Sequence, residues 1–451
     1  MIQKTLITDK KQELLTFLDE LRADASYASS SDRIMLFSDQ NNDVSHLKDE
    51  IAVLKEKLPE TKFLGVTMPS DGMLPGHETG FRGAGYSMLL TDRAKTELIY
   101  YDCSEISTTE AGKRLRREIR YRDHIAGIFV FAAGLEQEID KFLTTVGMYD
   151  KSEVAIIGAQ AGADGTSYIC GSFSDEPVSC GIAVLIFYGR GLHFYYNYDM
   201  GWNAIGKEMT ITGTDGNFCA TTIDDKPAAA IYKEYLGVEP DEYFTDNVRE
   251  FPLVTYRVDR EVVRTPSGYG DDGRLYFIAR VNKGDKVRLS YGNPIRLIER
   301  TKLYAETMHS FGPQALFLII CENRARFLKD MAGNDVIVYR NFMNQVAWVR
   351  GFAAILMDKK GGGVVNSAII SVGIREGAPS EADLAGSRGE MVSEIRGRGV
   401  VPLDQRLAMF LEKTTTELSE MAVEADSANE AKSEFLCCII NNSLLLIYLF
   451  F

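Results

Sequence analysis

The stretch Gly127-Ile-Phe-Val-Phe-Ala-Ala133 is an uninterrupted apolar run of the length of a buried strand. A helix pattern follows it at residues 136–146, and a second apolar run at residues 154–158 ends in a glycine. The rest of the unit is a loop at residues 159–177 and two strand-like runs at residues 180–188 and 192–198. This order predicts an α+β unit in which a helix crosses over between neighbouring strands.

The same order of elements occurs in two other parts of the chain. An earlier copy has a strand at residues 33–38, a helix at 44–58, a second strand at 62–67 and two closing strands at 85–91 and 97–102. A looser later copy has residues 315–321, 323–331, 346–357 (broken at Gly351) and 364–375. Duplication explains the recurrence, and chance repetition of common elements is the alternative. We predict repeated strand-helix-strand-loop-strand-strand units in mixed sheets, forming two domains, with a C-terminal coiled-coil helix after them.

Composition limits the classes of function. The 451 residues are 45% hydrophobic and 25% charged, which is ordinary for a globular protein, and the net charge of −14 argues against nucleic-acid binding. Seven cysteines without a C-x-x-C pair indicate free thiols in a reducing compartment. Residues 1–19 have a charged, helix-like pattern without an apolar core, so we expect no signal peptide there. We therefore expect a cytoplasmic protein.

The search for chemistry finds little. Residues 201–207 have the G-x-x-x-x-G-K spacing of a phosphate loop, but Glu208 replaces the Ser or Thr and a strand pattern replaces the helix. The five histidines are too far apart in sequence for a metal motif, although folding could bring some together. The glycine-rich residues 158–165 indicate a backbone that lies close to either a neighbouring strand or a small ligand. We expect no enzyme activity, no metal and no cofactor.

A heptad pattern precedes the C-terminal end. Its seam positions are Leu407, Leu411, Thr414, Leu418, Met421, Ala425, Ala428, Lys432 and Phe435. The alternation of four- and three-residue spacings favours pairing with a second helix, so we predict a homodimer through residues 407–435. An amphipathic helix packed on its own domain is the alternative. The hydrophobic tail at residues 437–451 is predicted to result from a frameshift or truncation, and a weak membrane anchor is the alternative.

Several of these segments resemble known families. Gly201-Trp-Asn-Ala-Ile-Gly206 with the strand pattern after it, Cys321-Glu-Asn-Arg-Ala325 and the segments at residues 366–367 and 372–377 are similar to the FIST sensory domains. Ala428-Asn-Glu-Ala-Lys-Ser-Glu-Phe-Leu436 resembles the entry to the phosphotransfer helix of sensor histidine kinases, but no histidine follows it. The resemblance implies a cytoplasmic input module that senses a small molecule, with amino acids as candidates, for a kinase output missing from this sequence. The alternatives are an enzyme of unknown reaction on this scaffold and an interaction module without a ligand.

The resemblance also implies boundaries. We predict an N-terminal helix at residues 1–29, a FIST N-terminal domain with two internal copies at 30–215, a FIST C-terminal domain at 216–383, a linker at 384–402, a signalling coiled-coil helix at 403–436 and the tail at 437–451. One departure from the family is that Gly351-Phe352 leads into Ala353-Ala354 and not into the usual Gly-Glu-Ile. A ligand role for that glutamate is therefore not expected in this chain.

The predicted ligand site combines the loops that end the second strand of each copy. Loops that leave the same edge of a sheet gather there, and small molecules bind in such crevices. Trp202 is expected to cover the apolar side, and Arg324 and Arg375 are the cations expected to pair with a ligand carboxylate, with ordinary ion pairs as the alternative. The predicted ligand-binding residues are Thr67, Ser70, Asp71, Gly158, Gln160, Gly162, Asp164, Trp202, Asn323, Arg324, Gly351, Phe352, Asn366 and Arg375.

Overall fold

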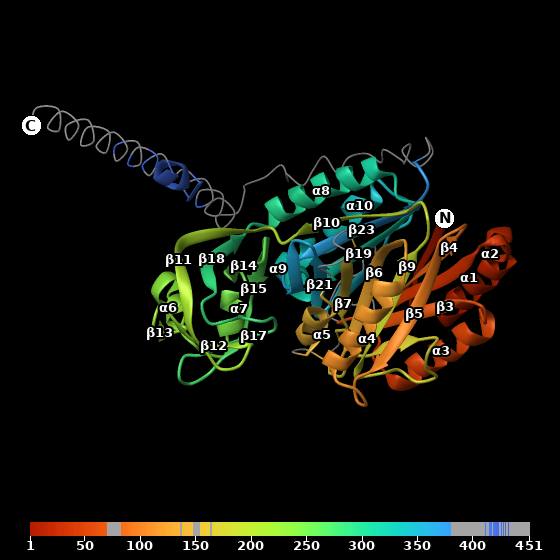
Figure 1. Ribbon diagram of the computed structural model, residues 1–451, viewed down its shortest axis with the longest axis horizontal. Coiled ribbons are helices and arrows are strands. Elements are labelled where there is room, and N and C mark those ends of the chain that lie inside the picture. The colour runs from red at the N-terminus through yellow and green to blue at the C-terminus, as the bar shows by residue number, and fades with distance from the viewer. Residues whose placement is uncertain are drawn as a thin grey trace, which may run out of the picture. The chain divides into compact units, whose positions relative to one another are not determined.

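The fold is known from a computed structural model. It describes residues 1–69, 83–135, 138–147, 154–162 and 165–379, together with single positions and short runs of a helix between residues 411 and 432. The chain divides into two compact units, residues 1–395 and 396–451, and each is considered by itself. The described sheets all belong to the first unit, whose elements are labelled in Figure 1.

The first module comes from the amino-terminal part of the chain. Its elements are β1 (Ile2–Thr8), α1 (Lys11–Ala23), α2 (Ala25–Ser29), β2 (Asp32–Asp39), α3 (Val44–Lys57), β3 (Lys62–Thr67) and β4 (Ala84–Thr91). Strands β2 and β3 are parallel, and α3 connects them. Strand β4 lies antiparallel to β2 on its other side, which gives the strand order β1-β4-β2-β3.

Two further modules have the same topology. The second contains β5 (Lys95–Asp102), α4 (Thr108–Tyr121), β6 (Ile125–Ala133), α5 (Ile139–Val146), β7 (Ile156–Gln160), β8 (Ile169–Gly171) and β9 (Gly181–Tyr188). The third contains β10 (Leu192–Asp199), α8 (Pro294–Phe311), β19 (Ala315–Cys321), α9 (Glu322–Leu328), η1 (Lys329–Met331), α10 (Asn334–Arg340), β20 (Ala347–Gly351), β21 (Ala353–Asp358), β22 (Gly361–Val365) and β23 (Ile369–Glu376). The orders β5-β9-β6-β7 and β10-β23-β19-β20, with parallel β6/β7 and β19/β20, confirm the predicted repeat.

The structure corrects the assignment of several strands to copies. Residues 97–102 and 192–198 were predicted to close the first and second copies, but β5 and β10 begin the sheets of the next modules. The predicted strands at 346–357 and 364–375 each divide into two strands of different sheets, because β21 pairs with β7 and β22 with β21, whereas β20 and β23 pair with β19. Strand β8 likewise pairs with β3 of the first module. The modules are thus joined by exchanged strands.

The amino terminus differs from the predicted helix at residues 1–29. Ile2–Thr8 is a strand, β1, that pairs antiparallel with β4 along its whole length, and helix starts only at Lys11. The terminal ammonium group of Met1 lies 2.7 Å from an Asp92 carboxylate oxygen and 3.1 Å from one of Glu376. Pairing with the edge of β4 therefore makes residues 2–8 a strand, although their charges had suggested a helix.

The inner faces of these three sheets share one hydrophobic core. Phe129 of the second module lies at its centre, with ring centroids 5.2 Å from Phe187 and 5.5 Å from Phe317 of the third module. Leu36 and Val66 contribute from the first module. Helices cover the outer faces, with α1 and α3 on the first module, α4 and α5 on the second, and α8 to α10 on the third (Figure 1). Burial of this shared apolar surface is the main force that holds the modules together.

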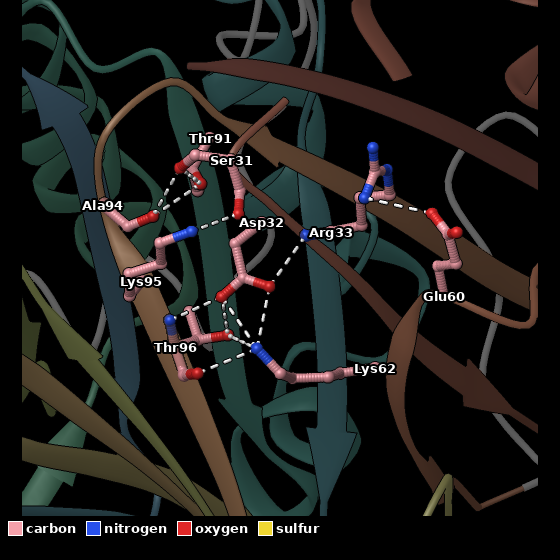
Figure 2. A network of polar contacts seen from close by, with 9 residues as sticks. All are labelled: Ser31, Asp32, Arg33, Glu60, Lys62, Thr91, Ala94, Lys95 and Thr96. Atoms are coloured by element: carbon pink, nitrogen blue, oxygen red, sulfur yellow. Dashed lines mark hydrogen bonds and ion pairs between the residues drawn. The ribbon is translucent and has the colours of Figure 1, made fainter. Parts of the chain in front are cut away.

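A polar network also joins the first two modules, as Figure 2 shows. The Nζ atom of Lys62 on β3 donates to both carboxylate oxygens of Asp32 on β2, at 2.7 and 2.8 Å, and to the Thr96 carbonyl of β5 at 2.9 Å. The Thr96 backbone N–H donates to Asp32 at 2.6 Å. Each buried polar group here has a partner, which is the condition for such a network to stabilise a fold.

A fourth sheet, in which the described strand pairs are antiparallel, is inserted between β10 and α8. Its elements are β11 (Trp202–Thr214), β12 (Cys219–Ile223), β13 (Lys226–Pro227), α6 (Ala230–Leu236), α7 (Phe244–Val248), β14 (Leu253–Arg257), β15 (Arg260–Arg264), β16 (Pro266–Tyr269), β17 (Leu275–Phe277) and β18 (Lys286–Gly292). The strand predicted after the Gly-x-x-x-x-Gly-Lys spacing is confirmed as part of β11. A phosphate loop at residues 201–207 would require a helix at that place.

The second unit contributes a helix. The described positions between residues 411 and 432 are helical, and the side chains of Leu418 and Met421 are 66% and 63% exposed in the single chain. In the described part of the chain, no helix has both the length and the apolar character that crossing a bilayer requires.

Candidate functional site

The loops that leave the three parallel strand pairs meet, and we call this place the loop junction. The Gly162 backbone N–H donates to the Thr67 carbonyl at 3.0 Å, and the Phe352 N–H donates to the Gln160 carbonyl at 3.0 Å. The Arg350 Nη2 donates to the Pro69 carbonyl at 2.6 Å. The loop junction therefore joins all three modules, and each contributes the loop that follows the second strand of its parallel pair.

The glycines of the loop junction allow close backbone approach. A Cβ added at Gly158 would lie 1.7 Å from the Val130 carbonyl oxygen of β6, and one at Gly351 would lie 2.6 Å from the Gln160 carbonyl oxygen. At Gly162 an added Cβ would lie 2.9 Å from Pro69 Cδ and 3.1 Å from the Phe352 backbone nitrogen. The backbone at Gly158 therefore lies close to a neighbouring strand, which was one of the two alternatives for residues 158–165; the other was a small ligand.

An amide cluster borders the junction at the end of β19. Asn323 Nδ2 donates to the Ser367 hydroxyl at 2.6 Å, and the Cys321 thiol lies 3.7 Å from the Phe352 carbonyl oxygen. Asn366 is 1% exposed, and neither its amide nitrogen nor its amide oxygen has a hydrogen-bond partner among the described residues. A buried unsatisfied amide costs about 1–3 kcal/mol and commonly indicates a functional role. Asn366 is the strongest ligand-recognition candidate of the predicted set.

The two predicted arginines lie away from the loop junction. Arg324 is completely buried, with its Nε 2.8 Å from Asp335 and its Nη1 3.6 Å from Asp199, so its charge is already paired inside the third module. Arg375 is on β23 at the end opposite Asn366, where its guanidinium lies 4.9 Å from the Phe311 ring centroid. Arg324 therefore fits the ion-pair alternative. Arg375 donates from Nη1 to the Gly377 carbonyl at the far end of β23, so neither arginine belongs to the candidate ligand site.

Trp202 is also placed differently from the prediction. It is 2% exposed and packs on Phe327, with ring centroids 5.0 Å apart, in the core between the third sheet and its helices. It covers no side of the loop junction. Ser70, Asp71 and Asp164 lie outside the described residues, so the structure gives no position for them.

A second site was missed by sequence reasoning. Asp39 at the end of β2 and His46 and Glu50 on α3 bring one ligand atom each within 4.8 Å of one another. They line a pocket of about 250 Å³ together with β1, α1 and Tyr86. The i, i+4 spacing of His46 and Glu50 on one helix face is visible in the sequence, whereas Asp39 joins them only through folding.

The electrostatics of this acidic pocket are unusual. Burial, together with the nearby Asp39 charge, raises the pKa of Glu50 to about 8. The hydrogen bond with Asp39 raises the pKa of His46. Two carboxylates buried side by side repel one another, and a bound cation would offset that repulsion.

The chain thus contains three repeated α+β modules whose parallel strand pairs end at one loop junction. A family model for the FIST N domain matches residues 32–226, and one for the FIST C domain matches residues 228–355. The chain belongs to the FIST family, whose domains are sensory, so it is a signalling input module. No curated protein matches the chain.

Proposed function

We propose that this chain is the cytoplasmic, small-molecule-sensing input part of a bacterial signal-transduction protein, and that it relays ligand binding through its C-terminal helix to a histidine kinase output. In this proposal the chain binds and signals and does not catalyse a reaction. Amino acids are the ligand class that the family resemblance favours.

The observation that carries the proposal is the loop junction. It is the place where one small molecule would contact loops of all three modules, since Gly162 donates to Thr67 there and Phe352 donates to Gln160. The unsatisfied Asn366 amide offers two donors and an acceptor beside it. A ligand changes the output only if it binds two arrangements of the modules with different affinity. A ligand at the loop junction would contact all three modules, so its affinity would depend on how they are arranged.

Replacement of Asn366 tests the ligand site. A thermal-shift screen of amino acids and related metabolites identifies a ligand, which at 100 times its dissociation constant should stabilise the wild type by about 2.7 kcal/mol. Asn366→Ala should lose most of that gain. Its stability without ligand should be equal or higher, because the amide that is removed has no partner. The exposed Asn247→Ala on α7 serves as the matched control and should keep the full shift.

The outcomes separate recognition from structure. A full ligand-induced shift in Asn366→Ala would remove this residue from the site. A variant that is destabilised without ligand would show that the amide has a structural partner. A screen in which no amino acid shifts the unfolding temperature would contradict the proposed ligand class.

Assembly through the C-terminal helix is a further expectation of this proposal. Leu418 and Met421 occupy seam positions and are exposed in the single chain, so a second copy would bury them. The double variant Leu411→Asp, Leu418→Asp should sediment as a folded monomer at tens of micromolar, whereas the wild type should be a dimer. Val423→Asp, which changes an equally exposed residue outside the seam, should stay dimeric. A monomeric wild type would contradict the predicted pairing.

A further inference from the structure

We propose that Asp39, His46 and Glu50 form a binding site for one divalent transition-metal ion, for which Zn²⁺ is the suitable probe. We call these residues the triad. The triad is separate from the Asn366 cluster, and the proposal does not depend on the sensor function proposed above.

Local structure brings the three side chains together. Asp39 is the last residue of β2, and α3 begins a few residues later at Val44. Its N-cap is Asp43, whose side chain accepts the His46 backbone N–H at 2.9 Å. This cap fixes the first turn of α3. His46 and Glu50 are one turn apart on the same face, which is turned to the end of β2. The end of β2 and one face of α3 thus meet at the triad.

The distances suit a metal centre. His46 Nε2 lies 2.9 Å from Asp39 Oδ2, and all three potential ligand atoms lie within 4.8 Å of one another. Ligands that bind zinc at about 2.0–2.2 Å in a tetrahedron lie about 3.3 Å apart, so small side-chain movements suffice. The pocket of about 250 Å³ leaves room for the remaining coordination positions.

Glu50 supplies an independent observation. It is only 5% exposed, and its Oε2 has no hydrogen-bond partner among the described residues, although the side chain lines the pocket. Its other oxygen accepts from the Tyr86 hydroxyl. Burying a carboxylate oxygen without a donor is costly, and a bound cation would remove that cost.

The surroundings also favour a cation. The Asp39 Oδ1 accepts the Asn41 N–H at 2.7 Å, and Tyr86 holds Glu50, so outer-shell groups orient both carboxylates. At the pocket rim Lys10 pairs with Glu13 at 2.8 Å, and Lys11 pairs at 3.9 Å with Asp49, which also lines the pocket, so both lysines already have a carboxylate partner outside the triad. An imidazole nitrogen with two carboxylates suits Zn²⁺ better than Mg²⁺ or Ca²⁺, which prefer oxygen ligands alone.

The triad is connected to the loop junction through the backbone. The Met68 N–H donates to the Asp39 carbonyl at 2.7 Å, and the Arg350 side chain donates to the adjacent Pro69 carbonyl. A metal ion that fixed Asp39 would therefore act on the first of the three loops that meet there.

Calorimetric titration of the chelator-treated full chain with ZnCl₂ tests the proposal. The wild type should bind one Zn²⁺ per chain with saturable affinity. His46→Gln and Glu50→Gln, which keep the side-chain size and remove one ligand each, should weaken binding at least about 100-fold. His193→Gln on β10 changes an exposed histidine away from the triad and should bind Zn²⁺ as the wild type does. MgCl₂ should bind much more weakly.

Unfolding midpoints without metal show that the variants are folded, so a loss of binding can be assigned to the missing ligand. Zn²⁺ binding that is unchanged in His46→Gln would place the ion elsewhere, for example on free cysteines, and would overturn the proposal. A wild type that takes up no Zn²⁺ would overturn it as well.

Discussion

Arg324→Ala should destabilise the protein by about 3–5 kcal/mol, because it leaves buried carboxylates without their cation. The Arg324 guanidinium binds Asp335 through two nitrogens, at 2.8 and 3.0 Å, and donates to the Thr301 hydroxyl at 2.9 Å. Both side chains of the Arg324–Asp335 pair are fully buried. Equilibrium denaturation followed by the fluorescence of Trp202 and Trp348 measures the loss.

Two comparisons make this result specific to the buried pair. Arg375→Ala, at the end of β23, should change stability by less than about 1 kcal/mol. The double variant Arg324→Met, Asp335→Leu should be more stable than Arg324→Ala, since it removes the Asp335 charge together with its cation. Asp199 keeps Arg300 as a partner, at 2.7 Å. Equal effects of Arg324→Ala and Arg375→Ala would contradict a structural role for Arg324. A stable Arg324→Ala variant that loses ligand binding would return this residue to the ligand site.

Gly158→Ala should destabilise the protein by about 3 kcal/mol or more, at the upper end of the cost of overpacking. The added methyl group would lie 1.7 Å from the Val130 carbonyl oxygen, 2.6 Å from the Val130 carbonyl carbon and 2.9 Å from its nitrogen. Backbone atoms of a central strand cannot move aside as a flexible side chain can. The pairing of β6 with β7 must therefore shift, and the same denaturation measurement records it.

Gly85→Ala is the matched control for this variant. Gly85 also lies in a strand, β4, but a Cβ there would meet only the Ser38 hydroxyl oxygen at 3.6 Å, an ordinary contact. Its effect should stay within about 1 kcal/mol. If Gly158→Ala were as stable as Gly85→Ala, the close approach of β7 to β6 would not explain the glycine at this position.

The sequence predicted the repeated unit because its signals are local. An apolar run, an amphipathic helix and a second apolar run are readable along the chain, and β2/β3, β6/β7 and β19/β20 are all parallel pairs with helices between them. The sheet that each later strand joins is not local information. Strand β5 pairs with β9 from Lys95 opposite Tyr188 onward, and nothing near residue 95 in the sequence indicates that partner.

The candidate sites were predictable in a similarly partial way. The equivalence of the copies predicted that loops near Thr67, Gly162 and Phe352 would gather, and the structure places them in hydrogen-bond contact. Arg324 was assigned to a ligand because its charge is visible in the sequence, whereas its pairing with Asp335 depends on how α9 and α10 pack. The triad depends on the same kind of tertiary convergence, since its aspartate comes from a strand and its other two members from a helix.

Because the modules exchange strands, the two domains recognised in the sequence do not coincide with the parts of the chain that form complete sheets. The boundary between the two matched family domains falls at residues 226–228, yet β21 and β22, which complete the sheet of β7, come from far beyond it. A gene fragment that ends at that boundary would encode β7 without its neighbour and leave a row of unpaired backbone groups open to aggregation. The two domains can therefore be recognised separately in the sequence, but neither has a complete set of strands without the other.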